Sequence, residues 1–147
     1  MTVAFRNVEV DASAPVDTWP YEALVTLIER GTLGDWLLLT RAIDEDPWGP
    51  VARVVEDYLG YERPYGVGPL LARAIDRARS TAQARERAAV AAEVAELVAR
   101  SGLSLTELAS RIGTSHSRLS TYRSGTVTPS ATMLHRLRTT VARLTRG

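Results

Sequence analysis

The sequence contains no cysteine and no lysine, and its apolar runs are short. Without cysteine, the chain can form neither a disulfide framework nor a zinc site built on thiolates. The longest apolar runs, residues 36–39 and 88–92, are far shorter than the ~20 residues that span a membrane as a helix. The N-terminus lacks a basic stretch followed by an apolar one. We therefore expect no membrane segment, no secretory signal and a cytoplasmic location.

All 18 basic side chains are arginine, and they are unevenly distributed. Residues 100–147 hold eight arginines and one acidic residue, a net charge of +7. Residues 1–99 hold ten arginines and sixteen acidic residues, a net charge of −6. Arginine stays charged and can contact phosphate or guanine through two parallel hydrogen bonds. The basic end therefore favours a polyanionic partner, although a bias in amino-acid usage would give the same split.

Residues 1–80 are predicted to form a helical module with an extended arm in front of it. Alternating apolar residues indicate a strand-like segment within residues 1–19. Apolar residues at helical spacing then predict four helices, of which Gly31 ends the first. The third is expected to begin at Asp46-Pro47, because Asp can cap a helix and Pro suits its first position.

Seven tryptophan and tyrosine side chains lie in this module. The simplest interpretation is a small helical core, with some of the aromatic groups at a dimer interface. We recognise no family resemblance in residues 1–80, and their composition fits dimerisation, ligand sensing and partner binding equally well. The tryptophan and tyrosine residues are Trp19, Tyr21, Trp36, Trp48, Tyr58, Tyr61 and Tyr65.

A long helix is expected to join the module to the rest of the chain. Neither proline nor glycine interrupts residues 70–101, and residues 81–100 are rich in Ala, Glu and Arg, which are good helix formers. The sequence therefore predicts an all-α protein with two domains, residues 1–80 and 81–147.

Residues 101–137 carry the signals of two short helices joined by a glycine turn. Ser104 and Glu107 have the spacing of a capping box, in which each side chain accepts a backbone N–H of the other residue. Gly113 permits the left-handed conformation that ends the first helix. Thr114 or Ser115 can then cap the second. Two short helices around a tight turn make a helix-turn-helix.

The second of these helices has an apolar inner face and a polar outer face. Leu119 and Tyr122 are expected to point inward, whereas the outer face carries hydroxyl groups and an imidazole. Such groups can donate or accept hydrogen bonds at base edges. The outer residues are His116, Ser117, Ser120 and Thr121, with Arg118 and Arg123 at the flanks.

A further helix is expected after this pair. Thr128 and Pro129 have the character of a cap and a first helical position. Apolar residues recur at helical spacing from Met133 to Leu144. The arginines of this segment are expected to stay available for solvent or phosphate; they are Arg136, Arg138, Arg143 and Arg146.

This stretch resembles the lambda-repressor-like, Cro/XRE family of helix-turn-helix domains. The resemblance implies a five-helix domain, whose second helix lies across the DNA backbone and whose third helix lies in the major groove. The residues that carry the resemblance are Gly102-Leu103, Glu107-Leu108-Ala109, Ile112-Gly113, Ser115, Leu119, Gly125 and Pro129-Ser130.

The resemblance implies DNA contacts from the third helix of the domain. Ser115 would bind a phosphate through its hydroxyl and backbone N–H. The base readers would be His116, Ser117 and Thr121, with Ser120 beside them, and the phosphate contacts would come from Arg118 and Arg123. The chain departs from the family at Leu105 and Thr126, where the family often has Gln and Lys that anchor phosphate, and at Arg123, where it often has Glu.

The sequence thus predicts a DNA-binding transcriptional regulator, a homodimeric repressor on a palindromic operator. The alternative is an antitoxin that binds a protein partner through residues 1–80 and autoregulates through the helix-turn-helix. A third possibility is a helix-turn-helix that serves only as a scaffold. We find no catalytic triad, no paired carboxylates with an evident pocket and no phosphate-binding loop, so we expect no enzyme. Two histidines without an acidic cluster predict no metal site, and nothing indicates a cofactor.

Overall fold

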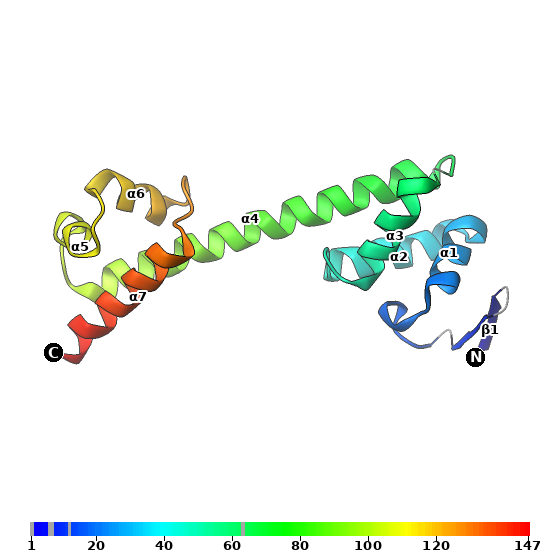
Figure 1. The fold of residues 1–147 in the computed structure, drawn as a ribbon, viewed down its shortest axis with the longest axis horizontal. Helices are drawn as coiled ribbons and strands as arrows, with labels where there is room; N and C mark the ends of the chain where they lie inside the picture. The colour runs from blue at the N-terminus through cyan, green and yellow to red at the C-terminus, as the bar shows by residue number, and fades with distance from the viewer. Residues whose placement is uncertain (1, 6–7, 12, 63) are drawn as a thin grey trace. The chain divides into compact units, whose positions relative to one another are not determined.

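A computed structural model describes residues 2–5, 8–11, 13–62 and 64–147. The chain divides into two compact units, residues 1–82 (unit 1) and 83–147 (unit 2), and each is described by itself. Helices make up most of both units, which confirms the all-α prediction (Figure 1). Within the described ranges, no helix is both long enough and apolar enough to cross a membrane.

The extended N-terminal arm is a small antiparallel hairpin. Strands β1 (Thr2–Phe5) and β2 (Val8–Asp11) pair with each other, as the alternating apolar residues indicated. Both strands contact helix α1 (Tyr21–Arg30). A short 3-10 turn, η1 (Val16–Thr18), leads from the hairpin into that helix.

Unit 1 packs three helices and the beginning of a fourth around one core. α1 ends at Gly31 as predicted, and α2 (Leu33–Glu45) begins with a capping box between Thr32 and Asp35. α3 (Pro50–Tyr61) and the start of α4 (Val67–Ser101) complete the unit. The fully enclosed large side chains of this core are Leu24, Ile28, Leu39, Ile43, Val55 and Leu71.

The predicted start of the third helix at Asp46-Pro47 is wrong, because Asp46 ends α2 instead. Its backbone N–H donates to the carbonyl of Ala42, and the N–H of Gly49 donates to Asp46, which closes a turn. Pro50, not Pro47, takes the first helical position of α3. Proline suits this position because an N–H there would have no acceptor within the helix. A side chain at position 49 would collide with the Asp46 carboxylate, which would have to move away.

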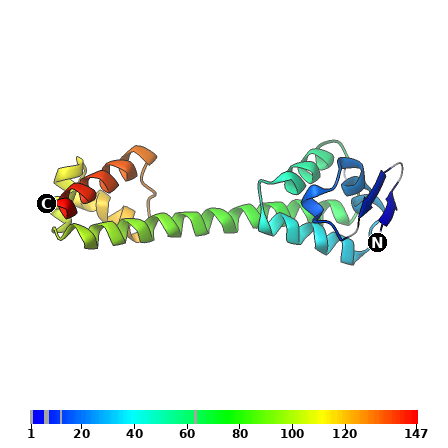
Figure 2. The same ribbon diagram turned by 90° about the horizontal axis from the view of Figure 1, so that it is seen from below.

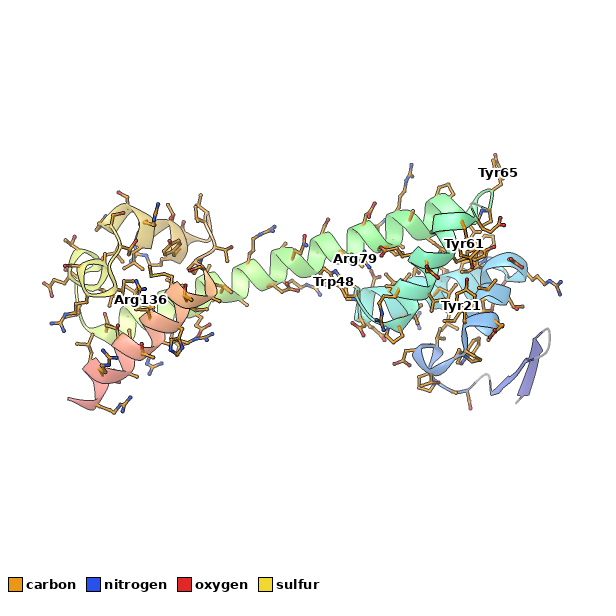
Figure 3. The ribbon with its side chains drawn as sticks, viewed as in Figure 1. Tyr21, Trp48, Tyr61, Tyr65, Arg79 and Arg136 are labelled. Atoms are coloured by element: carbon orange, nitrogen blue, oxygen red, sulfur yellow. The ribbon has the colours of Figure 1, made fainter. Side chains whose placement is uncertain are left out.

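Four of these seven tryptophan and tyrosine side chains are exposed, which corrects the interpretation that they mainly form core. Trp19 and Tyr58 are buried and Trp36 is half-buried. The others lie at the ends of helices or in turns, outside the apolar stripes. Tyr65 projects from the loop before α4 (Figure 3). The exposed aromatic residues are Tyr21, Trp48, Tyr61 and Tyr65.

Helix α4 is continuous over 35 residues, as the absence of Pro and Gly predicted. Arg79 fixes the part of α4 that belongs to unit 1. Its Nε donates to the carbonyl of Pro47 at 3.0 Å, and its guanidinium lies 5.9 Å from the ring centre of Trp48. The same guanidinium pairs with Glu56 on α3. One side chain therefore holds α4 against both the turn after α2 and the helix that follows it.

Unit 2 contains the end of α4 and three further helices: α5 (Leu105–Ile112), α6 (His116–Ser124) and α7 (Ala131–Arg146). The five helices implied by the resemblance are therefore four, because no Pro or Gly divides α7. The core residues of this unit are Val94, Leu97, Val98, Leu108, Ala109, Ile112, Leu119, Tyr122, Leu137 and Val141.

Helix α7 lies along the end of α4 in both views (Figures 1 and 2). Arg138 on α7 binds Glu93 on α4 with two hydrogen bonds, of 2.5 and 2.9 Å. The predicted start of α7 at Thr128-Pro129 is wrong by two residues. Its cap is Ser130, whose hydroxyl accepts the N–H of Met133 at 3.1 Å. A serine directly before the helix can bond an otherwise free N–H, whereas Thr128 lies too far upstream.

Candidate nucleic-acid interface

Helix α5 begins and ends as its sequence predicts. The Ser104 hydroxyl accepts the Glu107 N–H at 3.1 Å. This is one half of the expected capping box; the return bond to the Glu107 carboxylate is not among the hydrogen bonds of the described residues. Gly113 takes the left-handed conformation, with φ of 76°, and ends the helix. Leu108 and Ile112 are buried beneath it.

The turn after α5 is held by bonds from both sides. The Thr114 N–H donates back to the carbonyl of Ala109 at 2.9 Å. From α7, Arg136 donates to the carbonyl of Ile112 at 2.9 Å, and its side chain lies between α7 and α5 (Figure 3). A Cβ at Gly113 would lie 3.5 Å from the same guanidinium. Arg136 thus satisfies a carbonyl at the C-terminus of α5, where the helix leaves such groups unpaired.

The N-terminus of α6 has the geometry of an anion site. Ser115 is the cap, and its hydroxyl oxygen accepts the Arg118 N–H at 3.1 Å, which leaves the hydroxyl proton free to donate. The N–H groups of His116 and Ser117, the first two helical residues, have no acceptor among the described residues, and they lie at the positive end of the helix dipole. The Thr114 hydroxyl beside them is buried and unpaired. An open hollow is lined by Gly113, Thr114, Ser115 and Arg118.

The face of α6 opposite the core is polar and uncharged. Leu119 and Tyr122 are buried as predicted. His116 and Ser117 are exposed, whereas Ser120 and Thr121 are half-buried. The hydroxyl of Thr121 donates to the carbonyl of Arg118 at 2.6 Å, so its oxygen is left as an acceptor.

Sequence reasoning missed Ser124 on this face. It lies two turns after Ser117, so both project from the same side of α6, and it is exposed. Its hydroxyl lies 3.2 Å from the carbonyl of Thr121 and 2.9 Å from the hydroxyl of Thr126. The spacing could have identified Ser124 from the sequence, because a residue seven positions after Ser117 returns to the same helical face after two turns.

The arginines of unit 2 fall into two groups. Arg138 is occupied by Glu93, and the hydrogen bond between them holds the pKa of the Glu93 carboxyl below its usual value. Arg136 is bound to Ile112, and Arg146 donates to the carbonyl of Ala142. These three are exposed to solvent, as expected, but each already makes a hydrogen bond, because acceptors lie within reach on their own or neighbouring helices. The arginines of α5, α6 and α7 whose side chains make no hydrogen bond or ion pair within the described part of the chain are Arg111, Arg118, Arg123 and Arg143.

Two short helices cross around a left-handed glycine turn, and the second presents an uncharged polar face between free arginines. Residues 71–144 match a family model described as a helix-turn-helix domain. This match covers half of the sequence. The chain belongs to the helix-turn-helix family. The helix-turn-helix domain is of the Cro/XRE type, which confirms the resemblance found from the sequence. No curated protein and no solved structure matched the chain.

Proposed function

We propose that the chain is a sequence-specific DNA-binding regulator of transcription that acts as a homodimeric repressor. The observation that carries the proposal is the polar face of α6, which is solvent-accessible while Leu119 and Tyr122 anchor the opposite face in the core. A helix with this arrangement can enter the major groove without unfolding any part of unit 2.

The roles within the interface follow from the donors and acceptors that remain free. Ser115 and the free N–H groups of His116 and Ser117 hold a phosphate, as helix N-termini do. His116, Ser117 and Thr121 meet base edges, with Ser120 and Ser124 beside them. Arg118 and Arg123 lie on the flanks of this face and neutralise phosphates on both sides of the groove.

Dimerisation supports specificity because one nine-residue helix reaches few bases. Two linked copies read two half-sites about 34 Å apart, and the second binds at high effective concentration. The operator is then a palindrome. Unit 1 is the part of the chain that can join two copies or hold a partner, since it does not carry the reading helix.

The test is selection of bound sequences from random DNA, followed by a mass measurement of the complex. Ser117→Ala or Thr121→Ala should weaken operator binding by about 1–3 kcal/mol and leave nonspecific binding unchanged. Thr139→Ala is the matched control, because the Thr139 hydroxyl also donates to the carbonyl three residues before it. An operator preference that survives both α6 substitutions would remove this face from the reading site.

A second candidate function is that of an antitoxin, in which unit 1 neutralises a protein partner while the helix-turn-helix autoregulates. The observation in its favour is that, among the described residues, eight of the nine large hydrophobic side chains that are exposed lie in unit 1. Co-purification of a second, different chain at fixed stoichiometry supports this function. A complex whose mass equals two copies on DNA supports the homodimeric repressor instead.

A further inference from the structure

Helix α2 carries three large aliphatic side chains on its outer face. Leu33 is 61% exposed, Leu37 53% and Leu38 37%, although Leu39 and Ile43 of the same helix are fully buried. Leu33 and Leu37 lie one turn apart on one side of the helix, and Leu38 follows about 100° further around it, so the three cover neighbouring parts of the outer surface. Single exposed leucines are ordinary, but a contiguous apolar patch is a mark of an interaction site.

The patch continues into a hollow between α2 and the turn η1. The hollow has a volume of about 370 Å³, and Leu38 forms part of its wall. Its floor is apolar, and its rim is charged. The lining residues are Pro15, Val16, Asp17, Leu38, Arg41, Ala42, Glu45 and Asp46.

The charge around this hollow is predominantly negative. Three carboxylates, those of Asp17, Glu45 and Asp46, face a single cation, Arg41. Within the described ranges none of these four side chains forms an ion pair. Unit 1 as a whole has eight arginines and thirteen acidic residues, a net charge of −5. The carboxylates are therefore not neutralised by their own unit.

We infer that the α2 surface, defined as Leu33, Leu37 and Leu38 together with this hollow, binds a basic amphipathic segment of another protein. Apolar side chains of the segment, spaced by one helical turn, cover the leucines. An arginine or lysine beside them enters the hollow, where its stem meets the apolar floor and its charge meets the carboxylates. This inference does not depend on DNA binding by α6.

Charge complementarity selects this occupant over a second copy of the same surface. Two α2 surfaces facing each other would bring six carboxylates together against two arginines, and like charges in an interface disfavour association. A basic segment instead removes the leucines from water and neutralises the rim in one step.

The probe is a labelled synthetic helix of about 18 residues, long enough to form four turns, with leucines at every turn and arginines elsewhere. Two companions have the same length: one replaces each arginine with glutamate, and one keeps the composition but scatters the leucines. Fluorescence anisotropy with the full chain should show the first peptide binding at least about tenfold more tightly than either companion, and more weakly as salt is raised.

Variants then locate the site. Leu38→Ser and Glu45→Arg should each weaken the basic peptide by about tenfold or more. Leu70→Ser is the matched control, because Leu70 on α4 is also 37% exposed and lies outside the hollow, and it should bind as wild type does. Unchanged circular dichroism and melting temperature establish that each variant is folded, and unchanged operator binding separates this site from the proposed function of α6.

Three results would overturn the inference. The first is equal binding of the basic, acidic and scattered peptides, or binding of none of them. The second is full affinity in both Leu38→Ser and Glu45→Arg. The third is self-association of the wild type that Leu38→Ser abolishes in sedimentation experiments, which would assign the surface to a second copy of the chain.

Discussion

The two units differ in how their helices begin and in what they leave on the surface. In unit 2, the three helices after α4 each start at a serine whose hydroxyl accepts the N–H three residues later, at Ser104, Ser115 and Ser130. In unit 1, α1 and α3 have no side-chain cap, and Pro20 and Gly49 stand at those positions. Local signals therefore define unit 2, whereas unit 1 depends more on contacts between distant segments.

The two units also differ in the side chains that they expose. Unit 2 exposes hydroxyls and unpaired arginines, and Val127 is its one large exposed hydrophobic side chain. Unit 1 exposes leucines and aromatic rings among carboxylates. A polar, cationic surface suits nucleic acid, and an apolar, acidic surface suits protein. These surfaces fit the two kinds of recognition that we propose for one polypeptide.

The largest expected effect on stability comes from a cavity in the core of either unit, and it tests whether the two units are separate. Leu39 in unit 1 and Leu119 in unit 2 are both fully buried. Leu39→Ala and Leu119→Ala should each lower the free energy of unfolding of their own unit by about 2–5 kcal/mol. Residue-resolved hydrogen exchange measures the two units separately. If Leu39→Ala reduced protection in α5 to α7 as much as in unit 1, the units would unfold as one.

The next effect concerns the turn that orients α6. Arg136→Met removes the bond to the Ile112 carbonyl but keeps an apolar stem of similar length. We expect the free energy of unfolding to fall by about 1.5–3 kcal/mol, because a partly buried carbonyl loses a charged donor. Operator affinity should fall as well, since the turn sets the direction of α6. Chemical denaturation and DNA titration measure the two effects.

Arg143→Met is the control for Arg136→Met. Arg143 lies two turns further along the exposed face of α7 and makes no side-chain bond within the described residues. Its substitution should leave the stability nearly unchanged. Equal destabilisation by the two substitutions would mean that the bond to Ile112 does not hold the turn.

The sequence was most informative where local chemistry decides the structure. Gly113 ends α5, Ser115 caps α6, and Leu119 and Tyr122 are buried, all as expected from spacing and side-chain type. These features depend on neighbours within one or two turns. They were enough to predict the helix-turn-helix and the polar face that it presents.

Contacts between distant segments could not be read from the sequence. Arg79 meets a carbonyl 32 residues earlier, and Arg138 meets a carboxylate 45 residues earlier. Nothing in the local pattern distinguishes these arginines from the unpaired ones. The exposure of Tyr61 and Trp48 was unexpected for the same reason, because aromatic residues indicate a core unless the fold places them outside it.

A smaller effect is expected on the salt dependence of DNA binding, and it should distinguish the unpaired arginines of unit 2 from the paired ones. Arg118→Ala should lower the slope of log affinity against log salt by about 0.9, the value for one phosphate contact on duplex DNA. Arg138→Ala should leave the slope unchanged, because its guanidinium is occupied by Glu93. Titrations of operator DNA at several salt concentrations provide the comparison. Equal slopes for the two variants would contradict the division of the arginines into two groups.

The smallest effect belongs to unit 1 and is a dependence on pH. Burial, the hydrogen bond to Glu29 at 2.9 Å and the charges of Glu29 and Glu62 together raise the pKa of Tyr58 to about 12, and burial is the largest of these causes. The unfolded chain loses this proton near pH 10, whereas the folded chain keeps it. The unfolded state therefore binds fewer protons between these values, and the free energy of unfolding falls as pH rises through them.

Tyr58→Phe removes this titration and keeps the ring in the core. The wild type should be the more stable protein near pH 9, and its advantage over Tyr58→Phe should shrink progressively toward about pH 12. Urea denaturation of both proteins at each pH cancels the titrations that they share. An advantage that stayed constant across the window would mean that the Tyr58 proton is held no more tightly in the folded chain than in the unfolded one. The bond between α3 and α1 would then contribute packing but no electrostatic stabilisation to unit 1.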